Sequence, residues 1–132
     1  MSDTFRVPAH RELTVDERRL LEWLLVTGRA EGAEYVPQLV SLAVVSRCTC
    51  GCPTLDLAVG GRTSRTEGAS IILADAVGQS PEGVPVNVIL HAREGEISEL
   101  EVISMDATEV FSMPKPEMLD RVMPRNPTMA CS

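Results

Sequence analysis

A series of five Val- and Ile-rich segments between residues 42 and 105 constrains the fold more than any other feature of this sequence. In chain order the segments are LAVVSRC, TLDLAVG, ASIILADAV, VPVNVILHA and ISELEVISM. Short runs of β-branched residues that are bounded by Gly, Pro and Ser are typical of β-strands. We therefore expect four or five strands that form an antiparallel meander.

A helix is expected before the strands. Residues Thr14 to Glu17 have the pattern of a capping box, in which the Thr and Glu side chains satisfy backbone N–H groups that the first turn leaves free. A one-sided apolar stripe with helical spacing follows, formed by Leu20, Leu21, Leu24 and Leu25. Gly28 is expected to end the helix. Because an isolated helix of this length is only marginally stable, the stripe has to pack against the sheet.

The chain of 132 residues is long enough for one domain with a single core, and the expected class is α+β. A second, shorter helix over residues 31–40 would be kinked by Pro37, so that either one helix or a helix pair packs on the sheet. A short C-terminal helix is expected over residues 112–123, with Pro116 in its first turn. We assign residues 1–13 to an irregular arm, 14–123 to the single α+β domain and 124–132 to a disordered tail.

The turn at Glu94-Gly95 is expected to join the last two strands. A two-residue loop would place Glu99 and Glu101 opposite apolar residues of the preceding strand, on the buried face. A three-residue loop, Arg93-Glu94-Gly95, avoids this and gives Gly95 the left-handed position that such loops favour. Ser98 then lies on the apolar face. The opposite, mixed face gathers Asn87, Ile89, His91, Arg93, Ile97, Glu99, Glu101 and Ile103.

Charge and composition argue against several classes of function. Twelve basic against nineteen acidic residues give a net charge of −7, and binding to a phosphate backbone needs clustered basic residues, so we expect no nucleic-acid partner. No apolar run reaches the roughly 20 residues that span a bilayer, so we expect no membrane partner. The N-terminal residues lack the apolar core of a signal peptide. We expect a cytoplasmic location, in which cysteines stay reduced.

Three cysteines at alternate positions, Cys48, Cys50 and Cys52, lie in the stretch CTCGCPT. On an extended strand their Cα atoms would be about 6.6 Å apart, and a disulfide between neighbours would require the backbone to bend. The favoured interpretation is structural. Gly51-Cys52-Pro53 makes a tight turn or an edge irregularity between two strands, and the small cysteine side chains fill space beside it.

Two chemical roles stay open for the cysteine cluster. The thiolates could bind Zn²⁺ or Cu⁺, with His91, His10 or Cys131 as a fourth ligand, although the spacing differs from the C-x-x-C pattern of many structural zinc sites. They could also be redox-active, although the cluster precedes a strand and does not open a helix as thioredoxin-like motifs do. We expect no cofactor, and zinc is the candidate ion if one is bound.

The mixed face is a further candidate site. His91 beside Glu99 or Glu101 could act as a general base with an orienting carboxylate. Charged residues on one side of an antiparallel pair are also typical of a solvated face. The interleaved isoleucines indicate that another element or a second subunit partly covers this face.

Three segments in order, RELTVDERRLLEWLL, AVVSRCTCGCPTLDL and HAREGEISELEVISMD, resemble a group of small bacterial proteins of unknown function. Members of that group share an arm and helix, a CGCPS/T element that runs into a strand, and a closing hairpin of the type H-x-R-x-G-x-[IL]-x-E-L-E. The resemblance covers roughly residues 11–106 and implies the extent and fold of the domain, without an activity. It assigns Cys50, Gly51, Cys52 and Pro53 to one motif and Gly95, Glu99, Leu100 and Glu101 to the other.

Three hypotheses for the function follow from these features. The first is a non-enzymatic binding or interaction module that forms a homodimer through the mixed face. The second is a thiolate metal-binding protein that uses Cys48, Cys50 and Cys52. The third is a small enzyme that uses His91 with Glu99 or Glu101, and we lean against enzymatic function.

Overall fold

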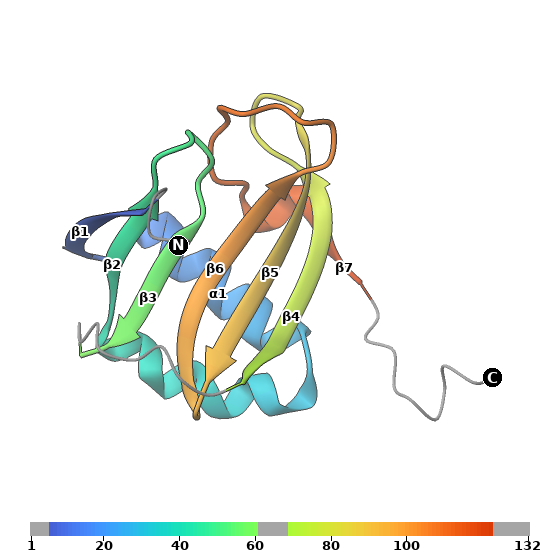
Figure 1. The fold of residues 1–132 in the computed structure, drawn as a ribbon. Helices are drawn as coiled ribbons and strands as arrows, with labels where there is room; N and C mark the ends of the chain where they lie inside the picture. The colour runs from blue at the N-terminus through green and yellow to red at the C-terminus, as the bar shows by residue number, and fades with distance from the viewer. Residues whose placement is uncertain (1–5, 61–68, 123–132) are drawn as a thin grey trace.

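The computed structural model describes residues 6–60 and 69–122. Its strands form one antiparallel sheet of seven strands in the order β1-β2-β3-β6-β5-β4-β7 (Figure 1). The strands are β1 (Arg6–Glu12), β2 (Leu42–Cys48), β3 (Leu55–Val59), β4 (Ser70–Gln79), β5 (Pro85–Arg93), β6 (Glu96–Ser104) and β7 (Leu119–Arg121). The predicted α+β class is confirmed. The predicted number of four or five strands is wrong, because β1 and β7 extend the sheet at its two edges.

Helices cover one face of this sheet. The α-helix α1 (Val15–Thr27) lies behind β6, β5 and β4 in Figure 1, and the 3-10 helix η2 (Ala30–Val40) crosses one end of the sheet. A second 3-10 helix, η3 (Pro116–Met118), precedes β7. The core lies between α1 and the sheet. No helix in the described part of the chain is long and apolar enough to cross a membrane.

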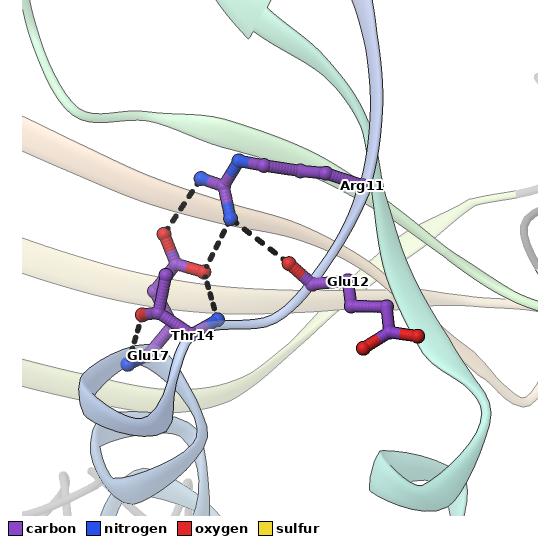
Figure 2. A network of polar contacts seen from close by, with 4 residues as sticks. All are labelled: Arg11, Glu12, Thr14 and Glu17. Carbon is purple, nitrogen blue, oxygen red and sulfur yellow. Dashed lines mark hydrogen bonds and ion pairs between the residues drawn. The ribbon is translucent and has the colours of Figure 1, made fainter.

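The start of α1 is fixed by the predicted capping box (Figure 2). The Thr14 hydroxyl accepts a hydrogen bond from the Glu17 backbone N–H at 3.0 Å, and the Thr14 N–H donates to Glu17 Oε1 at 2.9 Å. Arg11, in β1, adds two hydrogen bonds to the same carboxylate, at 2.9 and 2.8 Å. This network therefore ties the edge strand β1 to the first turn of α1.

The buried face of α1 is the predicted leucine stripe. Leu20, Leu21, Leu24 and Leu25 are at most 1% exposed. The helix ends at Gly28, as predicted, where the Gly28 N–H donates to the Leu24 carbonyl at 2.9 Å. The stripe packs on an apolar row that crosses the sheet, in which Leu55, Leu100, Leu90 and Ala74 are paired in register.

The sheet is not the single meander that the sequence predicted. β1, β2 and β3 are neighbours in chain order, and so are β4, β5 and β6. The two groups join through β3 and β6, so two strands, β6 and β5, lie between β3 and β4.

Strand β1 corrects the expected irregular arm over residues 6–12, whereas residues 1–5 lie outside the described part of the chain. This strand pairs with β2 from Arg6↔Cys48 to Glu12↔Ala43, with an irregularity between Pro8 and Arg11. Pro8 is tolerated because β1 is an edge strand, where the missing N–H is not needed for pairing.

Two predicted helices are also corrected. The segment expected to form a kinked helix is the 3-10 helix η2, which includes Pro37. The helix expected at residues 112–123 is only the one-turn η3, after which β7 pairs with β4 from Leu119↔Gly78 to Arg121↔Ala76. The tail at 124–132 lies outside the described residues.

The β5–β6 hairpin differs from the predicted three-residue loop. Glu94 and Gly95 have φ values of 51° and 80°, which is typical of a two-residue type I′ turn. Ser98 is then an extra residue in β6, because His91 pairs with Glu99 whereas Ala92 pairs with Ile97. This β-bulge restores the pairing of Leu90 with Leu100 and keeps both glutamates off the core, as the longer loop was expected to do.

The bulge moves Ile97 to the buried face, so its assignment to the mixed face was wrong. Ile97 is 1% exposed and belongs to the core. The Gln38 side chain, from η2, supports this end of the hairpin. It accepts a hydrogen bond from the Ile97 N–H at 2.9 Å and donates to the Gly95 carbonyl at 2.7 Å.

Candidate metal centre

The cysteine cluster forms the turn between β2 and β3. Cys48 is the last residue of β2, and Thr49 to Cys52 reverse the chain before β3 begins at Leu55. The Cys48 N–H donates to the Thr54 carbonyl at 3.4 Å and closes the turn. The predicted tight turn between two strands is therefore present, and the extended spacing of the cysteines does not apply.

This turn brings the three sulfur atoms together. The Cys50 Sγ lies 2.6 Å from the Cys48 Sγ and 3.0 Å from the Cys52 Sγ, and all three lie within 4.8 Å of one another. Backbone N–H groups also point at two of them. The Cys50 N–H donates to the Cys48 Sγ and the Cys52 N–H donates to the Cys50 Sγ, each at 3.4 Å. These two contacts hold the Cys48 and Cys50 sulfurs against the backbone of the turn.

The C-terminal half of the motif is anchored in the sheet. Thr54 is 5% exposed, and its hydroxyl accepts a hydrogen bond from the Val102 N–H at 2.9 Å and lies 3.2 Å from the Val102 carbonyl. Cys52 packs against the core while Cys50 is exposed. One end of the thiol cluster is thus held in place, and the middle thiol is open to solvent.

Gly51 cannot be replaced without disturbing this turn. Its φ of 101° is rarely adopted by residues with a side chain. A β-carbon at this position would also lie 2.7 Å from the Val110 side chain, since the segment after β6 runs beside the turn. The Gly in CTCGCPT is therefore required both by its backbone conformation and by the space available.

The segment beside the turn is held by Glu82, in the β4–β5 connection. Its carboxylate accepts hydrogen bonds from the Ser112 hydroxyl at 2.6 Å and from the Ser112 N–H at 3.1 Å. These bonds lower the pKa of Glu82 to about 2, since they favour the charged carboxylate.

No fourth protein ligand joins the sulfurs in the part of the chain that the structure describes. Among the His, Cys, Asp and Glu residues described, the three cysteines form the group whose ligand atoms are close enough to share one ion. His91 is bonded elsewhere, and His10 lies exposed on β1. Cys131, the third predicted candidate, lies outside the described residues.

The mixed face lies on the side of the sheet opposite α1. It brings together Asn87, Ile89, His91, Arg93, Glu99, Glu101 and Ile103, and Arg93 lies at its hairpin end, paired in register with Glu96. His91 Nε2 lies 2.8 Å from Glu101 Oε1, so Glu101 is its carboxylate partner, and Glu99 is its neighbour in register.

Two polar residues of β4 complete this face and were missed from the sequence. Ser70 Oγ lies 3.1 Å from His91 Nδ1, and Asp75 accepts a hydrogen bond from Asn87 at 2.7 Å. The register shift between Ile72 and Ala74 decides which β4 side chains lie on this face of the sheet, and no sequence pattern marks the shift. Both His91 nitrogens are thus occupied, so a general base at this position would first have to release a partner.

Comparisons with known proteins gave no match among family models, curated proteins or solved structures. The resemblance to the bacterial CGCPS/T group therefore stays a prediction. The function has to be argued from the geometry of the residues themselves.

Proposed function

We propose that this protein binds one soft metal ion, Zn²⁺ or Cu⁺, through the thiolates of Cys48, Cys50 and Cys52. The observation that carries the proposal is the convergence of the three sulfur atoms within 4.8 Å of one another. The sequence favoured a structural role because the cluster offers three cysteines, without a clear fourth ligand, at a spacing that differs from C-x-x-C. The convergence of the sulfurs at the turn supports a metal site with three protein ligands instead.

The donor set selects the ion. Thiolate sulfur is a soft ligand that favours Zn²⁺ and Cu⁺ over Mg²⁺ or Ca²⁺, which prefer oxygen. Bonds of about 2.3 Å to a tetrahedral ion place two sulfurs about 3.8 Å apart, so metal binding has to widen the present contacts by about 1 Å. Cys50 is exposed, and its side chain can turn outward to allow this.

The number of protein ligands determines how readily the bound ion can exchange. Zinc with three protein ligands keeps its fourth position for water or an incoming ligand, as in catalytic sites, whereas structural zinc sites have four protein ligands. Cu⁺ is satisfied by the three thiolates alone. We therefore propose an exchangeable ion at the rim of the sheet and not one that the fold depends on.

The substitution Cys50→Ser tests this function. It removes the central sulfur, and we expect it to weaken Zn²⁺ or Cu⁺ binding by more than about 100-fold, since losing even an outer partner of a ligand costs 10–100-fold. Competition with a chromophoric chelator under reducing conditions measures the affinity. Val40→Ser, at a position of η2 that is 85% exposed, is the control and should bind like the wild type. Equal binding by Cys50→Ser and the wild type would contradict the proposal.

A second function, self-association through the mixed face, is favoured by one observation. Ile72, Ile89 and Ile103 lie on β4, β5 and β6 in successive rows of the register, so they form a diagonal apolar stripe across the uncovered face. Ile72 and Ile103 are 42% and 41% exposed. We propose a second copy of this chain as the occupant of the stripe.

Ile103→Glu is expected to abolish the dimer, because it places a charge within the apolar stripe that the second copy would cover. Sedimentation velocity compares it with Val40→Glu, an equally drastic change on η2, where Val40 is 85% exposed. A wild type that is monomeric at high concentration, or a dimer that survives Ile103→Glu, would exclude the stripe as an interface.

A further inference from the structure

The Cys50 sulfur lies between the other two sulfurs, so it could form a disulfide bond with either of them. Its neighbours lie at 2.6 and 3.0 Å, on either side along the turn. A disulfide bond is 2.03–2.05 Å long, so the Cys48 and Cys50 sulfurs would bond after approaching by about 0.6 Å. The bent turn has already removed the obstacle that an extended strand presents to such a bond.

Exposure assigns different roles to the three thiols. Cys50 is exposed, whereas Cys48 and Cys52 are half-buried beside it. A disulfide that approaches from solvent therefore meets Cys50 first. The Cys52 N–H donates to the Cys50 sulfur at 3.4 Å and helps to hold it between its two neighbours.

We propose that the metal-free cluster carries out thiol–disulfide exchange with exposed disulfides, with Cys50 as the attacking thiol and Cys48 or Cys52 as the resolving thiol. This activity uses the residues of the metal site but does not require the metal. The class of substrate is a disulfide that needs no binding pocket, such as that of a small thiol or of a surface-exposed protein disulfide.

The exchange balances in two steps. The Cys50 thiol gives its proton to solvent and its sulfur attacks the substrate disulfide, which forms a mixed disulfide and releases the first substrate thiolate. Cys48 then loses its proton, attacks the Cys50 sulfur and releases the second thiolate. The two thiolates take up the two protons, so two electrons pass from the cysteine pair to the substrate disulfide.

The third thiol adds a further step. Because Cys52 lies 3.0 Å from Cys50 on its other side, its thiolate can attack the new disulfide at the Cys50 sulfur. The bond then moves from Cys48–Cys50 to Cys50–Cys52, and Cys48 is free again. The oxidised state is thus shared between two disulfides that have Cys50 in common.

Intact-mass spectrometry of chelator-treated, reduced protein with glutathione disulfide tests this activity. All variants carry Cys131→Ser, so that only the cluster reacts. In this background the chain should lose two hydrogens and keep no glutathione. With Cys48→Ser and Cys52→Ser added, it should keep one glutathione on Cys50, because no thiol resolves it. With Cys50→Ser instead, the rate should fall by at least about tenfold.

Two results would overturn the proposal. One is stable glutathione adducts on the background protein without an internal disulfide, and the other is a Cys50→Ser rate equal to that of the background. Far-UV circular dichroism of each variant confirms that the sheet is intact. A metal titration of the same samples separates the two proposals, because binding without exchange contradicts only this one and exchange without binding contradicts only the metal site.

Discussion

Ile97→Ala is expected to lower the free energy of unfolding by about 2–5 kcal/mol, the range for truncating a buried aliphatic side chain. Ile97 is 1% exposed and lies in the core beneath the helices. Its burial depends on the bulge at Ser98. Without the bulge, the neighbouring glutamates would face the core. The measurement is urea denaturation followed by the fluorescence of the single Trp.

Ile103→Ala is the matched control, in the same strand and with the same loss of atoms, and both variants are measured at a protein concentration too low for the proposed dimer. Ile103 is 41% exposed on the opposite face, so its truncation in the monomer should cost less than about 1 kcal/mol. Equal losses for the two variants would mean that Ile97 is not on the buried face and would refute the two-residue turn with its bulge.

Glu17→Ala is expected to lower the free energy of unfolding by about 1.5–3 kcal/mol, because it removes the Glu17 half of the capping box and leaves Arg11 without its carboxylate. Glu17 is 8% exposed, although the Arg11 side chain is 42% exposed and solvent screens part of the pair. Asp16→Ala is the control, since Asp16 lies in the same helical turn with a side chain that is 68% exposed. It should cost only a few tenths of a kcal/mol.

The Glu17 carboxylate is also expected to make the stability of the fold depend on pH. Burial alone would raise the pKa of Glu17, but the hydrogen bonds from Arg11 and Thr14 outweigh it, and the pKa lies below its ordinary value of 4.5. The unfolded chain therefore binds this proton more readily than the folded chain. Stability from Glu17 is present above pH 4.5 and is lost as the pH falls through the folded pKa, so Glu17→Ala should flatten the acid side of the stability profile. An unchanged profile would contradict the network.

Local features of the fold could be predicted from the sequence. The capping box at Thr14, the leucine stripe of α1 and the stop at Gly28 are set by residues within four positions of one another. Such interactions do not depend on the rest of the chain. The strands between Leu42 and Ser104 were also marked by their β-branched residues.

Pairing between distant segments could not be predicted. β1 and β7 are edge strands with little apolar pattern. They are strands because each pairs with a distant segment, β2 or β4, and that pairing leaves no mark in their own sequence. The bulge at Ser98 shows the same limit. The sequence required that Glu99 and Glu101 avoid the core, and both a longer loop and a bulge satisfy that requirement.

The sequence named the residues of the candidate metal site as one alternative, but their geometry could not be predicted. Cys48, Cys50 and Cys52 were identified as soft ligands from their identity alone. Their convergence depends on the positive φ of Gly51 and on the anchoring of Thr54 to Val102, a residue 48 positions away. Neither could be read from the spacing of the cysteines.

Native mass spectrometry of the wild-type protein, purified under reducing conditions without chelator and then supplied with Zn²⁺ or Cu⁺, tests the central claim most directly. We predict the mass of the chain with one bound ion, and a thiol titration that shows Cys48, Cys50 and Cys52 protected while the ion is present. A metal-free mass with all thiols reduced and reactive would contradict the metal site.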